Sequence, residues 1–271
     1  MKFALRNTLA VAAFLAAGAV GATPFAGGWA LNEGTGSLTF SQDALSALSA
    51  SSSNLRTPST IPSYDGGPAG GAANTASVAQ GIVGLTFSSA NVNGDSLVSL
   101  QAANSFVDIK RTTIDENDVQ QSNSILMANF DVNLANSTIY ADLYTRNNTA
   151  GTTISFGKKA IFTADVVGVV GGTEGKIVVD VAPWGGIIGR ASGSLAGSLR
   201  MNLATAEIIL TGLGLSTSAT DPVATLVRTA NWGNTTASGT FVVPIPEPSS
   251  WALMAVGLLT LGIASRRKQA A

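Results

Sequence analysis

Residues 125–134 read ILMANFDVNL, and the order of apolar and polar side chains in this stretch decides the fold class. Alternate side chains of an extended strand point to opposite faces of a sheet. The stretch therefore predicts a half-buried β-strand. Its buried face would carry Leu126, Ala128, Phe130, Val132 and Leu134. The opposite face ends in Asn129, Asp131 and Asn133.

The same period continues along the chain. Asn136 and Ser137 predict a turn, and residues 138–145 alternate again, so the two segments predict a β-hairpin. Further strands are expected at residues 81–88, 95–101, 105–111, 152–156, 160–170, 176–182, 194–203 and 207–215. Many short strands separated by turn residues are typical of a mainly β protein, here an antiparallel β-sandwich or a barrel-like sheet.

Little of the remaining chain favours helix. One short helix is expected at residues 41–51, where Ser41 fits the N-cap position and Ala44, Leu45 and Leu48 share a face. Residues 49–74 are rich in Ser, Pro and Gly and predict a long loop. The glycines at positions 189, 193 and 197 predict a loop that leads into the strand at 194–203.

The composition excludes several classes of function. The 271 residues include no His and no Cys, and only 11% are charged. A Ser-His-Asp triad, a cysteine nucleophile, a Cys/His zinc site and a disulfide framework are therefore impossible. Charge is nearly balanced and basic runs are lacking in the middle of the chain, which argues against nucleic acid as a partner.

The N-terminus carries an export signal. Residues 1–22 read MKFALRNTLAVAAFLAAGAVGA, with Lys2 and Arg6 before an apolar stretch of 12 residues at positions 9–20. A small-residue cleavage site ends at Ala22. This order predicts a secretory signal peptide and the secretion machinery and signal peptidase as partners.

The C-terminus is organised differently. Residues 244–250 read PIPEPSS and predict an extended spacer, because proline supplies no amide donor to a helix or sheet. The uncharged stretch at 251–264 spans about 21 Å as a helix, against about 30 Å for a hydrocarbon core, so a buried core helix is the alternative. Trp251 and the flanking serines favour a transmembrane helix over residues 251–265. The basic cluster Arg266, Arg267 and Lys268 then orients residues 266–271 as a cytoplasmic tail.

These C-terminal residues resemble the sorting signal of PEP-CTERM proteins of Gram-negative bacteria. The resemblance rests on Pro246, Glu247, Pro248 and Ser249, on the short apolar helix, and on the terminal basic cluster. It implies a substrate of an exosortase, a membrane transpeptidase-like enzyme that cuts near the motif. It also implies export to the cell envelope, either anchored in the membrane or released to the cell surface or matrix.

Between these ends lies the passenger, residues 23–243, expected as one exported β-rich domain. Removal of the five basic residues of the two ends and of Glu247 leaves ten basic and fifteen acidic residues, a net charge of −5. A mildly acidic domain has no electrostatic reason to bind nucleic acid or anionic lipid.

Few residues of the passenger suggest chemistry. The cluster Asp115-Glu116-Asn117-Asp118 has oxygen ligands for Ca²⁺, but Val119 and Gln120 break the pattern of a calcium loop. We predict a solvated turn there, and assign no metal, no other cofactor and no catalytic residue. Before the sorting motif there are four glutamates, at positions 33, 116, 174 and 207, from which a carboxylate pair would have to come. Trp29 and Trp184 are the candidates for stacking on a sugar, but a tryptophan more often packs in a core, and a buried aromatic is the favoured interpretation of Trp29.

Three functions remain open at this stage. The leading interpretation is a non-enzymatic component of the envelope or extracellular matrix. The alternatives are a module that binds exopolysaccharide, and a carboxylate-dependent hydrolase of matrix glycan.

Overall fold

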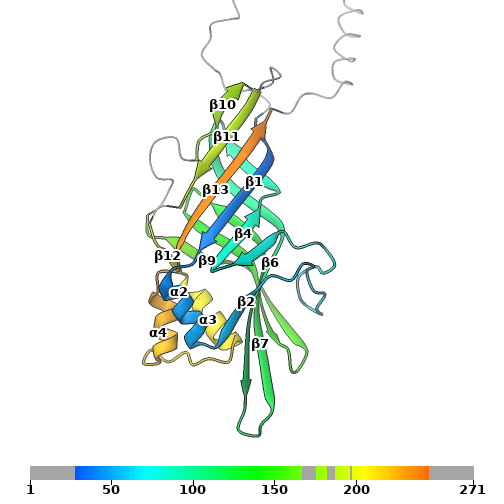
Figure 1. Ribbon diagram of the computed structural model, residues 1–271, viewed down its shortest axis with the longest axis vertical. Coiled ribbons are helices and arrows are strands. Elements are labelled where there is room, and N and C mark those ends of the chain that lie inside the picture. Colours follow the sequence, from blue (N-terminus) through cyan, green and yellow to red (C-terminus); the bar gives the residue numbers. More distant parts are fainter. Residues whose placement is uncertain (1–27, 167–174, 182–186, 196, 244–271) are drawn as a thin grey trace, which may run out of the picture.

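In the computed structural model, residues 28–166, 175–181, 187–195 and 197–243 are described, and they form a mainly β domain of two antiparallel sheets (Figure 1). The predicted signal peptide, spacer, transmembrane helix and basic tail lie outside these residues. The described helices, of at most ten residues, fall short of the length needed to cross a bilayer.

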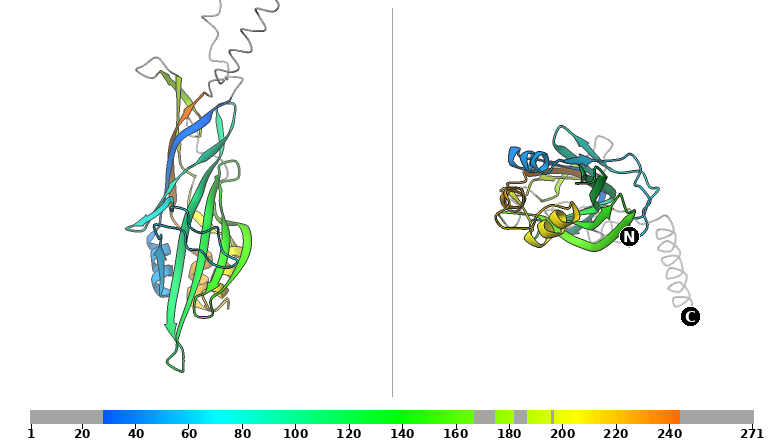
Figure 2. Two further views of the ribbon diagram at one scale, coloured as in Figure 1. Left: turned by 90° about the vertical axis from the view of Figure 1, so that its right-hand side faces the viewer. Right: turned by 90° about the horizontal axis from the view of Figure 1, so that it is seen from below.

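The first sheet has six strands in the order β10-β11-β13-β1-β4-β3. They are β1 (Ala30–Thr39), β3 (Ala76–Ala79), β4 (Ile82–Thr86), β10 (Val178–Val181), β11 (Ile187–Gly193) and β13 (Asn234–Val242). The second sheet has the order β12-β9-β8-β7-β6-β2, with β5 paired to β6. It is curled like a half-barrel against the first sheet (Figure 2). Its strands are β2 (Ser53–Arg56), β5 (Ser89–Asn93), β6 (Ser96–Ile114), β7 (Gln120–Asn133), β8 (Thr138–Asn147), β9 (Thr152–Ala164) and β12 (Leu199–Met201).

The hairpin predicted around Asn136 and Ser137 is confirmed as β7 and β8. The strands expected at 95–101 and 105–111 are parts of one long strand, β6, and those expected at 152–156 and 160–170 share β9. Of the strand expected at 194–203, the described residues retain only β12. The expected loop at 189–197 is wrong in its first half, because residues 189–193 belong to β11, which pairs with both β10 and β13.

The buried face predicted for β7 is half wrong. Phe130, Val132 and Leu134 pack into the main core between the sheets, but Leu126 and Ala128 pack on the other side, against Phe106 and Ile61. Asn129 has φ 53, and the register with β6 and with β8 shifts at this residue. A β-bulge adds a residue to one strand and so reverses which side chains face the core.

The expectation of one helix is also wrong, because the described residues form three. The helix at 41–51 is confirmed as α2 (Gln42–Ala50), with Ser41 accepting from the amide of Ala44. The strand expected at 207–215 is instead the end of α3 (Leu203–Gly212), capped by Asn202. The third helix, α4 (Pro222–Thr229), begins after Asp221, whose carboxylate accepts from the amide of Ala224.

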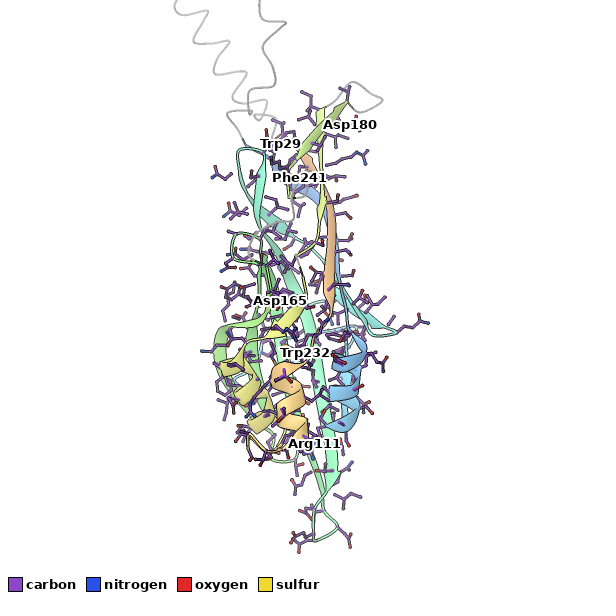
Figure 3. All side chains as sticks on the ribbon, turned by 90° about the vertical axis from the view of Figure 1, so that its left-hand side faces the viewer. Trp29, Arg111, Asp165, Asp180, Trp232 and Phe241 are labelled. Carbon is purple, nitrogen blue, oxygen red and sulfur yellow. The ribbon has the colours of Figure 1, made fainter. Side chains whose placement is uncertain are left out.

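The helices gather at one end of the sandwich, where Arg111 of β6 joins two of them (Figures 1 and 3). Its Nε donates to the carbonyl of Ser51, the C-cap of α2, at 3.1 Å. Its Nη1 donates to the carbonyl of Leu213, the C-cap of α3, at 3.0 Å. A cation at two helix C-termini satisfies carbonyls that have no partner within the helix.

Gly233, just before β13, provides a test of the packing there, and Gly151, which also has a positive φ, is its control. Gly233 has φ 123, and a Cβ there would lie 1.9 Å from the carbonyl oxygen of Thr39. Gly151, in the turn between β8 and β9, has φ 73 with nothing within 4 Å of a Cβ. We expect Gly151→Ala to cost about 1 kcal/mol of unfolding free energy, and Gly233→Ala about 3 kcal/mol or more. Denaturant unfolding followed by tryptophan fluorescence measures both, and equal losses would contradict the packing at Gly233.

Candidate functional site

Both ends of the described chain lie at the same end of the molecule, opposite the helices. β1 and β13 are antiparallel neighbours, and the first residue of β1, Ala30, pairs with the last of β13, Val242. Figure 1 shows the beginning of β1 and the end of β13 side by side at the top. The segments expected to direct export therefore join the passenger at one place.

A small second core closes this end of the sandwich. The ring of Trp29 is 9% exposed and packs with Ile177 and Phe241 (Figure 3). Its indole Nε1 donates to Asp95 Oδ1 at 3.1 Å. Trp29 is therefore the buried aromatic that the sequence favours and not a residue that stacks on a sugar, and it joins the start of β1 to the β5–β6 turn. The other candidate, Trp184, lies outside the described residues.

The outer face of the six-stranded sheet carries rows of hydroxyl groups. One row crosses four strands through the paired residues Ser192, Ser238, Thr35 and Thr86. A second row includes Thr236 and Ser37, whose hydroxyl oxygens lie 2.8 Å apart. Adjacent strands are about 4.8 Å apart, so these hydroxyls form a regular polar surface.

Four charged residues border a hollow on the same sheet. The hollow measures about 640 Å³ and is lined by Glu33, Lys176, Asp180 and Arg190, together with hydroxyl side chains of the rows just described. Asp180 and Arg190 form an exposed ion pair, with Nε 3.4 Å from Oδ2. Both signs of charge and several hydroxyls are thus available to a ligand along one open surface.

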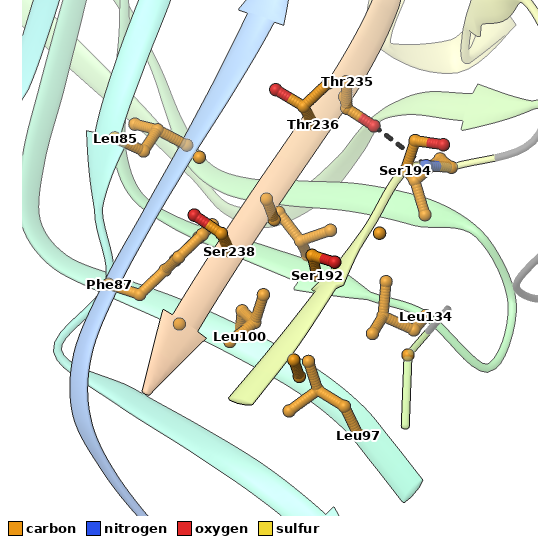
Figure 4. Close-up of a pocket in the computed structure, with 18 of the residues that line it drawn as sticks. Leu85, Phe87, Leu97, Leu100, Leu134, Ser192, Ser194, Thr235, Thr236 and Ser238 are labelled. Atoms are coloured by element: carbon orange, nitrogen blue, oxygen red, sulfur yellow. Dashed lines mark hydrogen bonds between the residues drawn. The ribbon is translucent and has the colours of Figure 1, made fainter. Parts of the chain in front are cut away.

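The cavity that the described residues line between the two sheets is far smaller than this hollow. A cavity of about 50 Å³ lies between the sheets among Leu85, Phe87, Leu97, Leu100 and Leu134 (Figure 4). Pockets for small organic ligands are typically about 300–1,000 Å³. The cavity is therefore a gap in the packing and not a site for a sugar.

The glutamates are dispersed. Glu33 is on β1 and Glu116 is in the β6–β7 turn, while Glu207 of α3 pairs with Arg228, Oε1 to Nε 2.8 Å. Glu33 and Glu207 line different hollows. Glu174 lies outside the described residues. The geometry thus gives no support to a catalytic pair among the three described glutamates.

The acidic cluster at 115–118 is confirmed as an exposed turn, which closes the β6–β7 hairpin. Asp115 Oδ1 accepts from the amides of Asn117 and Val119, both at 2.9 Å, and Oδ2 accepts from Gln121 Nε2 at 2.9 Å. These bonds, that from Gln121 first, lower the pKa of Asp115 below its ordinary value. Across the described ranges, no three Asp or Glu side chains gather closely enough to hold a metal ion.

The comparisons with known proteins concern the C-terminus. The PEP-CTERM protein-sorting motif matches residues 244–268, which include Pro246, Glu247, Pro248, Ser249 and the basic cluster Arg266, Arg267 and Lys268. The motif marks the chain as an exported protein that exosortase sorts to the cell envelope. This is therefore a protein with a PEP-CTERM sorting signal attached to a β-rich passenger. Neither a curated protein nor a solved structure matches the chain.

The hydroxyl rows and the charged hollow were not among the features predicted from the sequence. Their signal was present as a period of two at residues 35–39, TGSLT, and 236–240, TASGT. Small residues occupy three of the four inward positions, Gly36, Ala237 and Gly239, and a Cβ on Gly36 would lie 2.7 Å from the ring of Phe87. With Leu38 as the one large apolar residue on the inner face of these stretches, the alternation of apolar and polar side chains is too weak to predict a strand.

The turn at Asp115 gives a test by titration. Hydrogen bonds to the carboxylate stabilise the folded turn above the pKa of the unfolded chain, and this stabilisation is lost as the pH falls through the lowered folded pKa. We expect Gln121→Ala to raise the pKa of Asp115 toward its ordinary value. The control Gln120→Ala should leave it unchanged. Carboxyl ¹³C NMR measures the midpoints, and an unaltered midpoint in Gln121→Ala would show that the bond is not formed in solution.

Proposed function

We propose that this protein is a non-enzymatic component of the cell envelope or extracellular matrix, delivered there through its PEP-CTERM signal. The observation that carries the proposal is the pairing of Ala30 with Val242, which puts both directing segments at one end of the passenger. The helices and the β6–β7 hairpin lie at the far end (Figures 1 and 2). A domain held by its C-terminus would then extend its length away from the membrane.

The chemistry of the surface supports the same role. The chain has no His or Cys, and its described glutamates lie apart. What the six-stranded sheet offers instead is a regular surface of hydroxyls, which suits contact with a hydrated matrix. Two further steps are part of this proposal. Signal peptidase cleaves the chain after Ala22. Until the sorting enzyme acts, residues 251–265 anchor the chain in the membrane, with residues 266–271 in the cytoplasm.

The intact mass of the protein from cells tests the proposal. We expect a wild-type species that begins near Thr23 and ends near Pro246–Pro248, because the sorting enzyme removes the apolar helix. Glu247→Ala should remain uncut, whereas the control Glu116→Ala, in an exposed turn at the far end, should be processed normally.

Other masses would have clear meanings. A wild-type protein that retains residues 251–271 would be a plain membrane-anchored protein, and the sorting step would be wrong. A species that retains residues 1–22 would contradict the signal peptide.

A second candidate function is binding of exopolysaccharide at the charged hollow. Lys176 and Arg190 place cations beside the hydroxyl rows, and Arg190 shares its charge with Asp180. A polymer with carboxylate and hydroxyl groups would bind its carboxylates to these two cations and its hydroxyls to the rows. The hollow is open to solvent and has a volume of about 640 Å³.

A matched pair of arginines tests this candidate. Arg190 and Arg200 each form an exposed ion pair with an aspartate, at 3.4 and 3.3 Å, but only Arg190 lines the hollow. With alginate as the probe, we expect Arg190→Ala to weaken binding at least fivefold and Arg200→Ala to leave it unchanged. Dextran, which has no carboxylates, should bind less tightly than alginate to the wild type. Equal effects of the two substitutions would exclude the hollow as the binding surface.

A further inference from the structure

Apolar side chains are concentrated at the end of the molecule from which the chain leaves. Of the eleven large hydrophobic residues that are exposed within the described ranges, five lie on β10, at the start of β11 or at the end of β13. They are Val178, Val179, Val181, Ile187 and Val242. Val181 is 70% exposed, and the five residues lie on three strands that are neighbours in the first sheet, so they are grouped rather than scattered.

The register explains why three of these side chains, those on the core side of the β10–β11 hairpin, are uncovered. Ile177 is buried, and its amide donates to the carbonyl of Asp95 in the β5–β6 turn at 2.7 Å. That turn is the end of the second sheet on this side, and β10 continues past it. Val179 and Val181 follow Ile177 at a period of two, so they face the same side with no strand opposite them in the described part of the chain.

Ile187 extends this uncovered face. It is the direct partner of Val181 across the β10–β11 pair. We call Val179, Val181 and Ile187 the apolar tip. The ion pair between Asp180 and Arg190 lies on the other face of the hairpin, since Arg190 pairs with Val178 and Asp180 with Ile188. The core side of the hairpin is therefore purely apolar at Val179, Val181 and Ile187, whereas the outer face carries the ion pair beside Val178.

The chain holds this tip close to the predicted membrane segment. Val242 pairs with Ile188, so β13 ends beside the tip. Seven residues, 244–250, separate Val243 from Trp251. Fully extended, they span at most about 25 Å. A tether of this length keeps the tip at a high effective concentration near the bilayer, so weak affinity is sufficient for contact.

We propose that the apolar tip rests on the outer surface of the lipid bilayer while the chain is still attached through its C-terminal helix. This inference rests on the proposed membrane anchoring. The core-side face of the hairpin lies on the lipid, with Val179, Val181 and Ile187 at the boundary between headgroups and acyl chains. Asp180 and Arg190 remain on the aqueous side. Zwitterionic lipid is sufficient, because the contact depends on apolar side chains.

The tip thereby sets the orientation of the passenger. Two attachments, the spacer and the tip, hold the domain upright, while a spacer alone would let it turn freely. The β6–β7 hairpin, with the exposed Val119 beside its turn, then points away from the membrane (Figure 1).

Single-cysteine labelling tests the proposal, because the natural chain has no cysteine. Val181→Cys and the control Val119→Cys place an environment-sensitive fluorophore on exposed positions at opposite ends of the molecule. The full chain is reconstituted in phosphatidylcholine vesicles, with or without nitroxide-labelled lipid. We expect nitroxide quenching of the label at position 181 to be at least threefold stronger than at 119, and its emission to shift to the blue.

Each other result would overturn the proposal in a distinguishable way. Flotation with the vesicles but equal, weak quenching at both positions would overturn the tip contact and leave the anchor intact. Failure to float with the vesicles would overturn the anchor and the tip contact together. Efficient disulfide formation between two unlabelled molecules of the Val181→Cys variant, independent of lipid, would assign the tip to a second copy of the chain.

Discussion

The buried hydroxyl of Ser105 stabilises the β-bulge between β6 and β7, on which the shape of the second sheet depends. Its Oγ donates to the carbonyl of Ala102 at 2.6 Å and accepts from the amide of Phe130 at 2.9 Å, in a position with no exposure to solvent. These backbone groups belong to Ala102 and Phe130, the pair of residues next to the register shift between β6 and β7. An unpaired buried amide or carbonyl is costly, so the hydroxyl allows the bulge to exist inside the protein.

The bulge creates a second buried face, which a loop must cover. After the change of face, Leu126 and Phe106 point away from the first sheet and pack under Ile61 of the segment 57–75. Asn74 fastens that segment, because its amide group accepts from the backbone amide of Phe106 and donates to the carbonyl of the same residue, both at 2.8 Å. One side chain thus bonds to Phe106 as a neighbouring strand would. This explains why Ile125 to Ala128 are buried in succession without belonging to a parallel sheet.

The sequence predicted local structure well where periodicity, turn and cap agree. The β7–β8 hairpin and the Ser41 cap are examples, because their determinants lie within a few residues. The face of Leu126 depends on Asn129 and on Ser105 of another strand, and no local pattern contains that pairing. The succession of Ile208 and Ile209 favours a strand at residues 207–215. The Asn202 cap and burial against the second sheet instead make residues 207–212 part of α3. The charged hollow joins residues from β1, β10, β11 and β13, whose adjacency only the fold supplies.

The position of β13 connects the fold to the sorting signal. This C-terminal strand lies between β11 and β1 inside the first sheet. Until residues 234–242 are in place, the strands β10 and β11 are therefore separated from β1, β4 and β3. Buried Phe241, one of its last residues, completes the small core around Trp29. The passenger therefore cannot finish folding until nearly all of it has been exported, and the sorting motif begins two residues after β13 ends. Because the spacer is rich in proline and unsuited to extending β13, the strand can close the domain without drawing the motif into the sheet, where a processing enzyme could not reach it.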